Sequence, residues 1–198
     1  MKLKHNYTPW EHIEIENYLP PHRFKQIQDL AQEELKKFHI KGTNTPRGKY
    51  INFLSEDIVP ETSKLFSLLP RRESTGQLKK LIHWAIIPPH VNYPTHIDNR
   101  SRLCTVTYYI SPDDNIGTIL CKNSSTNDDG DHNAPNLPTE KEYEVEWKPN
   151  KIFLHCSGLG KWHRYSSGDK IRINLSCFLV QPDLIHEGRP DHDYLIDL

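Results

Sequence analysis

Short segments of alternating apolar and polar residues follow one another from about residue 81 onward, separated by Pro, Gly, Asn and Asp. Alternation with a period of two is typical of strands that bury one face, and the separating residues favour turns. We predict strands at residues 81–87, 103–110, 117–121, 143–147, 151–155 and 170–180. A chain of this kind is expected to form a double-sheet jelly roll, or double-stranded β-helix, with a pocket between its sheets.

Helical periodicity precedes the strands. After Pro20-Pro21, the apolar residues Phe24, Ile27, Leu30, Ala31, Leu35 and Phe38 recur at helical spacing and predict a helix over 21–38. A shorter helix is expected over about 57–69, with Pro60 in its first turn. The expected fold class is therefore α+β, mainly β, with N-terminal helices bracing the jelly roll.

One domain accounts for the whole chain, since 198 residues lie within the usual size range of single domains. We expect a helical support region over about 1–80, the jelly-roll core over about 81–182, and a tail over 183–198 that extends on the surface.

The run His96-Ile97-Asp98 has the spacing of a metal-binding pair. Residues two apart on an extended strand point to the same side, so His96 and Asp98 are expected to hold one ion together, with His163 as the third ligand. Two imidazoles and one carboxylate cover one face of an octahedral ion and leave the other open, as in non-haem Fe(II) oxygenases. Structural zinc, in contrast, usually closes its shell.

Arg172 lies nine positions after His163, in an alternating segment in which Ile171 and Ile173 face the opposite way. A guanidinium among apolar strands is costly unless it is paired, and its planar fork suits a carboxylate held by two parallel hydrogen bonds. A dicarboxylic co-substrate would supply that partner.

These motifs resemble those of the Fe(II)- and 2-oxoglutarate-dependent dioxygenases, and most of all those of the prolyl 4-hydroxylase group. The resemblance covers roughly residues 81–182 and includes His96-Ile97-Asp98-Asn99, the strand Thr105-Val106-Thr107-Tyr108-Tyr109-Ile110, and Gly117-Thr118-Ile119-Leu120. It implies that His96, Asp98 and His163 bind iron and that Arg172 binds the distal carboxylate of 2-oxoglutarate. It further implies that Tyr109 hydrogen-bonds this carboxylate and that Tyr93 lies near the iron.

The same resemblance implies the reaction: Fe(II), 2-oxoglutarate and O2 hydroxylate an unactivated C–H bond, with release of succinate and CO2. The substrate is a prolyl residue of a protein or peptide, or a free amino acid or other small metabolite. A jelly roll that binds metal or ligand without turnover, and a zinc hydrolase with the same triad, are alternatives.

Two departures from the family pattern concern the co-substrate. The tyrosine of a Tyr-x-Gly-like run upstream of the metal motif is missing from Ala85-Ile86-Ile87-Pro88-Pro89, and Asn174 stands where relatives often have Ser.

Four other features have a simpler explanation beside a functional one. Arg102 lies near a position where protein hydroxylases meet their substrate, but surface solvation explains it too. His155 is expected to be an ordinary strand histidine, and Trp162 to pack beside the His163 imidazole or in the core. The polar segment from Lys122 to Asn133 suggests a lid at the pocket mouth more than a calcium loop.

Composition and charge exclude several classes of protein. A net charge of -1, from 25 basic and 26 acidic residues, gives no global field for nucleic acid. No segment approaches the roughly 20 apolar residues of a membrane span, and the first residues lack the apolar core of a secretion signal. We therefore expect a soluble cytoplasmic protein in which Cys104, Cys121, Cys156 and Cys177 are buried, reduced thiols. The oligomeric state does not follow from the sequence.

Overall fold

Two antiparallel sheets form the framework of the computed structural model, which describes residues 1–70, 76–99, 101–121, 140–158, 160–185 and 192–198. The large sheet contains β1 (Lys2–Asn6), β2 (His12–Glu16), β3 (Tyr50–Leu54), β4 (Lys79–Ile87), β6 (Arg102–Ser111), β9 (Lys151–Cys156), β11 (Arg172–Val180) and β12 (Leu195–Asp197). The small sheet contains β5 (Asn92–His96), β7 (Thr118–Cys121), β8 (Lys141–Val145) and β10 (His163–Ser166).

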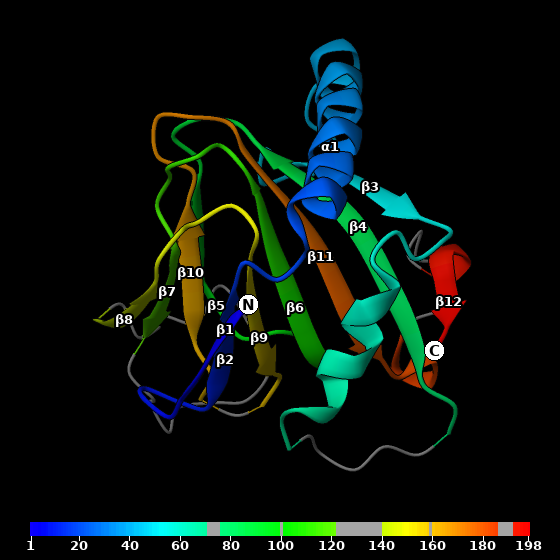
Figure 1. Cartoon of the computed structure of the whole chain (residues 1–198), viewed down its shortest axis with the longest axis vertical. Helices are drawn as coiled ribbons and strands as arrows, with labels where there is room; N and C mark the ends of the chain where they lie inside the picture. The colour runs from blue at the N-terminus through cyan, green and yellow to red at the C-terminus, as the bar shows by residue number, and fades with distance from the viewer. Residues whose placement is uncertain (71–75, 100, 122–139, 159, 186–191) are drawn as a thin grey trace.

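The strand order explains the layout seen in Figure 1. The large sheet runs β1-β2-β9-β6-β11-β4-β12, with β3 also paired to β4, and the small sheet runs β5-β10-β7-β8. All of these pairings are antiparallel. The chain is thus mainly β, as predicted, and the six predicted strands are all present with small differences at their ends.

One helix covers the large sheet, α1 (Pro21–Lys41), and confirms the helix predicted over 21–38. It begins at Pro21. Proline lacks a backbone N–H, and in the first turn of a helix this group has no partner within the helix. Ile27 and Ala31 are buried against the sheet, whereas Leu30 is 44% exposed. The helix ends where Gly42 adopts φ 70° and donates its N–H to the Phe38 carbonyl at 2.7 Å.

The second predicted helix is a shorter 3-10 helix, η1 (Pro60–Ser67), rather than a helix over 57–69. Val59 has φ -134°, outside the helical range, so the helix can begin only at Pro60. Thr62 and Leu65 are both buried, and a spacing of three matches the 3-10 repeat. In Figure 1, η1 lies in front of the large sheet below α1. Two further short 3-10 helices are η2 (Pro182–Leu184) and η3 (His192–Tyr194).

The first 80 residues are not a helical support region alone, because they also supply β1, β2 and β3. In β2, Ile13 and Ile15 are buried, and the strand pairs with β9. β3 pairs with β4. The expectation for the tail also needs correction: β12 pairs with Lys79, Lys80 and Leu81 of β4, so this part of the tail adds a strand to the sheet.

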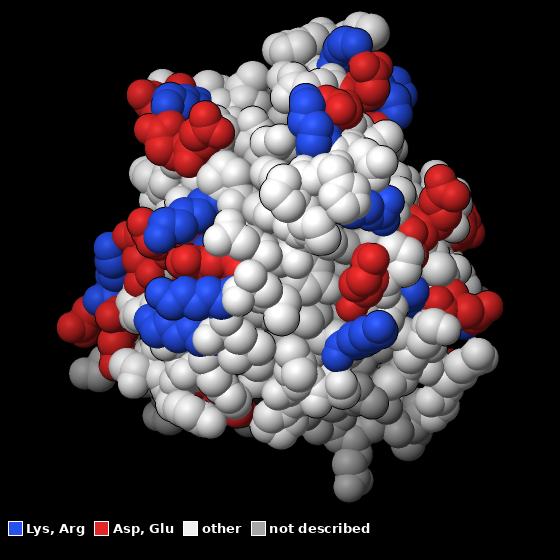
Figure 2. Space-filling view, viewed as in Figure 1, with Lys and Arg blue, Asp and Glu red and all other residues white. Residues whose placement is uncertain are grey.

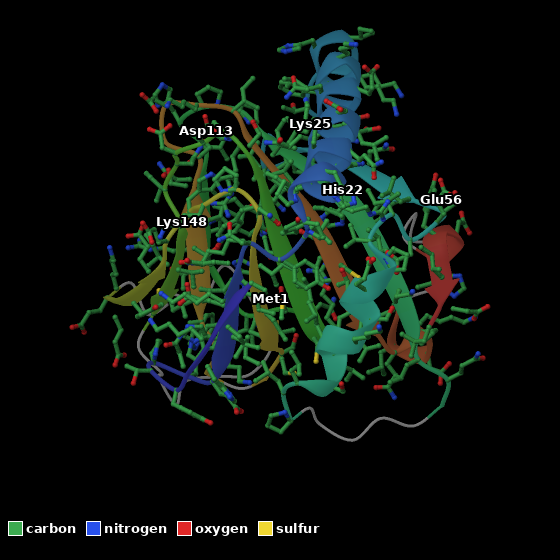
Figure 3. All side chains as sticks on the ribbon, in the orientation of Figure 1. Met1, His22, Lys25, Glu56, Asp113 and Lys148 are labelled. Carbon is green, nitrogen blue, oxygen red and sulfur yellow. The ribbon has the colours of Figure 1, made fainter. Side chains whose placement is uncertain are left out.

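Strict alternation along the central strands divides the large sheet into two faces. Side chains on one face, among them Trp84, Val106, Leu154 and Leu175, pack with α1 and η1 in the main hydrophobic core. Side chains on the other face point toward the small sheet, and Figure 3 shows side chains filling the space between the strands, while the labelled Lys25 and Glu56 lie outside. A single-residue shift of any central strand would exchange the two sets.

The remaining expectations concern thiols, surface charge and membranes. Cys104, Cys121, Cys156 and Cys177 are buried thiols, as predicted. On the face shown in Figure 2, Lys and Arg side chains lie among Asp and Glu side chains. Within the described residues, no helix has the length and apolar character needed to cross a membrane. The polar segment from Lys122 to Asn133, expected to be a lid, lies outside the described residues.

Gly117 gives a direct test of the fold next to the predicted co-substrate region. A Cβ at this position would lie 1.9 Å from the Val145 carbonyl oxygen, a backbone atom that cannot move without separating β7 from β8. Gly117→Ala is expected to lower the free energy of unfolding by about 1–3 kcal/mol, measured by urea denaturation. Gly158→Ala is the matched control, because its Cβ would meet only the flexible end of Lys161 at 3.6 Å. Equal stability of the two variants would contradict the packing of β7 on β8.

Candidate functional site

The structure brings His96, Asp98 and His163 together at one end of the small sheet. His96 is the last residue of β5 and His163 the first of β10, and the two are direct partners in the pairing of these strands. Their ring centroids are 4.3 Å apart, and one ligand atom from each of the three residues lies within 4.8 Å of the others. Small side-chain rotations would place all three on one ion.

The position of Asp98 differs from the expectation in one respect. β5 ends at His96, so Asp98 lies in the segment that follows the strand and not on the strand itself. A turn follows directly, in which Arg102 donates its backbone N–H to the Asn99 carbonyl at 2.9 Å. The carboxylate beyond the strand end is held by Thr105 and Arg102.

Backbone carbonyls orient both imidazoles. His96 Nδ1 lies 3.0 Å from the Pro94 carbonyl oxygen, and His163 Nδ1 lies 3.1 Å from the Lys161 carbonyl oxygen. A carbonyl can only accept, so each Nδ1 carries the proton and each Nε2 carries the lone pair that a metal requires. His163 Nε2 lies 4.0 Å from Asp98 Oδ1, which places this nitrogen on the side of the carboxylate.

Asp98 is fixed in its charged form by four neighbours. Thr105 donates its hydroxyl to Oδ2 at 2.5 Å, and Arg102 lies 3.4 Å from Oδ1. Burial alone would raise the pKa of this carboxyl, but the surrounding His163, His155 and Arg102 hold it well below its ordinary range. An ionised carboxylate between two imidazoles is a donor set that fits a divalent cation.

His155 lies against the cluster but is not part of it. Its Nε2 is 3.5 Å from Asp98 Oδ2, while burial lowers the pKa of this histidine to about 3, so the ring is neutral. Of the two alternatives for Trp162, the core position is the one observed, because Trp162 packs with Ile97 and Cys121. Trp10 lies near the His163 imidazole, with ring centroids 6.3 Å apart. His155 lies on a strand, as expected, and the pairing of β9 with β6 places it beside Thr105 and so near Asp98. The sequence gave no signal for Trp10, because its contact with His155 joins segments far apart in the chain.

Arg172 is a buried cation to which no described acidic residue is ion-paired. It is only 1% exposed, and its Nη1 donates to the carbonyls of Ile116 at 3.2 Å and Ser166 at 3.4 Å. Its Nε has no hydrogen-bond partner among the described residues. Burial lowers the pKa of this guanidinium, and Tyr109 and Tyr165 act in the opposite direction. A buried guanidinium with an unused donor is what a carboxylate ligand would satisfy.

Tyr109 does not line the cavity, whereas Arg172 does. It is fully buried and stacks on Trp147, and its hydroxyl shares a 2.7 Å hydrogen bond with Thr118 Oγ1. Thr118 in turn lies 3.5 Å from Arg172 Nη2 and lines the cavity, whereas Tyr109 is not among the lining residues. The structure therefore places Thr118 between Tyr109 and the cavity.

A cavity of about 840 Å³ joins the three candidate ligands to Arg172. Its wall on the large sheet consists of the face opposite the main core, and includes Ala85, Thr105, Thr107, Asn174 and Ser176. Tyr93 lies in the wall of the small sheet, 4.8 Å from His96 between ring centroids, and stacks on Tyr165.

Several lining residues had been assigned a different role or none. Arg102 lines the cavity and lies over the Phe178 ring at 3.8 Å, so the solvated-surface interpretation is wrong. Arg47, Lys49 and Tyr165 also line the cavity and were not predicted. Only Tyr165 had a signal in the sequence, because it is two positions after His163 and therefore shares its face.

Comparison by sequence finds no match, either to a protein-family model or to a curated protein. Comparison by structure does. A prolyl-4-hydroxylase from Pseudomonas putida is 14% identical, with a TM-score of 0.58 over 86% of this chain and 92% of the other. A Trichoplax adhaerens prolyl hydroxylase in complex with a peptide fragment of the hypoxia inducible factor is 16% identical, with a TM-score of 0.60 over 87% and 84%.

A third similar structure contains a different kind of compound. The epimerase SnoN, in complex with Fe3+, alpha ketoglutarate and nogalamycin RO, is 9% identical, with a TM-score of 0.58 over 94% of this chain and 90% of the other. The resemblance noted in the sequence is thereby confirmed at the level of the fold: this chain has the fold of iron- and 2-oxoglutarate-dependent oxygenases, prolyl hydroxylases among them.

Proposed function

We propose that this chain is an Fe(II)- and 2-oxoglutarate-dependent dioxygenase that hydroxylates an unactivated C–H bond and releases succinate and CO2. In this proposal the two sheets form a double-stranded β-helix within a single domain. His96, Asp98 and His163 hold the iron, and Arg172 holds the distal carboxylate of 2-oxoglutarate. The shared fold and the convergence of the three ligands in one cavity support it.

The observation that carries the proposal is the buried Arg172, which has no acidic partner among the described residues and lies in the same cavity as the triad. Two imidazoles and a carboxylate alone would also suit a hydrolytic zinc site, in which water takes the open position. A hydrolase, however, gives no reason to keep a guanidinium in the interior. A diacid that reaches from the metal to Arg172 gives that reason, because its second carboxylate neutralises the buried cation.

The bound iron and 2-oxoglutarate would supply the chemistry that no side chain can, the activation of dioxygen and the electrons that this activation requires. The chain itself would bind and orient. Thr105 and Arg102 hold the Asp98 carboxylate, and the Pro94 and Lys161 carbonyls hold the imidazoles in the tautomer that a metal needs. The residues around the three ligands and Arg172, such as Thr105 and His155, are buried and limit the access of water there.

Loss of one ligand should abolish turnover. With Fe(II) and air, the wild type is expected to convert 2-oxoglutarate to succinate, and Asp98→Ala and His163→Ala to lose at least about 100-fold of this rate, because a binding site with two ligands retains little of the metal. Asp29→Ala, which changes an exposed aspartate on α1, is the control. Similar succinate formation by all four proteins would contradict the assignment of the ligands.

Loss of the Arg172 guanidinium should affect the KM for 2-oxoglutarate. Arg172→Met is expected to raise the KM for 2-oxoglutarate by about 10- to 100-fold, the value of a charge-assisted bidentate hydrogen bond, and to leave the Fe(II) requirement nearly unchanged. Arg23→Met, at an exposed arginine of α1, serves as the control. If Arg172→Met shifted the iron requirement as much as the 2-oxoglutarate requirement, the assignment of Arg172 to the co-substrate would be wrong.

The relation between Tyr109 and Thr118 leads to a comparison of two variants. Thr118 lines the cavity and Tyr109 bonds to it from behind. Thr118→Val is therefore expected to raise the KM for 2-oxoglutarate at least as much as Tyr109→Phe, and each by several-fold, since each removes one neutral hydrogen bond. A larger effect of Tyr109→Phe would support direct contact between this tyrosine and the co-substrate, as the resemblance implies.

A further inference from the structure

The cavity has more positive charge than the proposed iron and 2-oxoglutarate explain. Arg47, Lys49, Arg102 and Arg172 line it, and among the described lining residues Asp98 is the one acid. A divalent ion and a doubly charged diacid offset each other, and Asp98 offsets a single cation. Side chains that remain charged and uncompensated in a partly enclosed cavity are costly unless a ligand brings the opposite charge.

Lys49 is the cation with the weakest compensation. It is half-buried, and its Nζ lies 3.4 Å from the centre of the Tyr93 ring and 4.9 Å from that of Tyr165. No described carboxylate lies within ion-pair distance of it. Arg47, two residues earlier, also lies over Tyr93 and donates to its hydroxyl at 2.5 Å. The exposed Arg47 and the half-buried Lys49 thus share one aromatic ring at the cavity wall, and no acid of the described part of the chain is paired with either.

The segment that carries these cations is separate from the residues that hold the metal and the co-substrate. Arg47 and Lys49 lie between α1 and β3, whereas Arg172 is held from β7 and β10 and the triad from β5, β6 and β10. His83, on β4, adds a second observation: it lines the cavity, is 8% exposed, and its Nδ1 has no hydrogen-bond partner among the described residues. Arg47, Lys49 and His83 could therefore all bind a polar ligand in this part of the cavity.

We propose that the cavity binds a substrate that carries its own anionic group, a carboxylate or a phosphate, and that Lys49 and Arg47 hold this group. The inference rests on the proposed function and specifies the class of its substrate. An anion at this position would lie between Lys49 and Arg47 and supply the negative charge that both need. The Tyr93 ring would keep its cation–π contacts with the two side chains.

The titration of Lys49 agrees with this geometry, because a buried amine with no described acidic partner readily loses its proton, and a bound anion would restore its charge. Burial, with the charges of Arg102, Arg172 and Arg47, lowers the pKa of Lys49 to about 6, and Asp98 acts weakly in the opposite direction. Tyr93 and Tyr165 also face the amine. Because the folded pKa is below the unfolded one, the unfolded state binds more protons above pH 6, so stability should rise with pH through this range. Lys49→Met should flatten this rise and increase the thermal stability of the ligand-free protein at pH 7.

The test uses protein loaded with Mn(II) and N-oxalylglycine, an unreactive analogue of 2-oxoglutarate, at constant ionic strength. Inorganic phosphate and acetate are titrated in separate arms, and the rise in Tm is followed. In the wild type at least one anion should raise Tm with saturation, and Lys49→Met should raise its half-saturating concentration about tenfold or more. Lys49→Arg should keep most of the effect. The control is Lys170→Met, at an exposed lysine paired with Asp114.

The outcomes separate the two proposals. If N-oxalylglycine stabilises the protein only with metal, but neither anion acts through Lys49, the anionic substrate is refuted and the proposed function stands. If Lys49→Met abolishes the effect of N-oxalylglycine itself, Lys49 belongs to the co-substrate site and the inference is again refuted. If N-oxalylglycine has no metal-dependent effect on the wild type, both proposals fail. Saturation by phosphate alone or by acetate alone identifies the anionic group.

Discussion

The alternation of side chains along β6, β9 and β11 is the constraint on which the rest of the structure depends. Each central strand is buried on both faces, yet the two faces differ in kind. One contributes Val106, Leu154 and Leu175 to the core beneath α1, and the other contributes Thr105, His155 and Arg172 to the cavity region. Because the period is two, the same hydrogen-bond register that packs the core also sets the positions of the polar groups.

This arrangement shows why a polar cavity is tolerated in the middle of a small protein. The apolar face buries large side chains such as Trp84 and Tyr108, and this burial stabilises the sheet. The other face can then hold a charged arginine, an ionised aspartate and neutral histidines whose pairing is incomplete. Incomplete pairing of buried polar groups is typical of sites that bind a ligand, where selection favours function over maximal stability.

The sequence predicted the parts of the molecule whose signals are local. His96 and Asp98 are two residues apart, and Arg172 lies nine residues after His163, so motif spacing placed all four in one region. The long alternating runs of β6 and β11 and the periodic apolar residues of α1 were predictable for the same reason.

The rest depended on contacts between distant segments. β1, β2 and β3 were not predicted, and two of them pair with distant parts of the chain. β2 pairs with β9, more than a hundred residues away, and β3 pairs with β4. Lys49 and Arg47 lie in a short polar segment, where the sequence does not distinguish a cavity cation from a solvated one. The resemblance implied that Tyr109 bonds the co-substrate, but the position of Thr118 in front of it became visible only in three dimensions.

The central claim is that one diacid is bound at two points. One end binds the metal ion held by the three ligands, and the other end binds Arg172. The most direct test is the affinity for 2-oxoglutarate, measured by calorimetry under anaerobic conditions with and without Fe(II). Binding of two ligands that contact each other is thermodynamically coupled, so the account predicts that Fe(II) lowers the Kd for 2-oxoglutarate by at least about tenfold, and that Asp98→Ala removes the coupling. The same Kd with and without Fe(II) would contradict it.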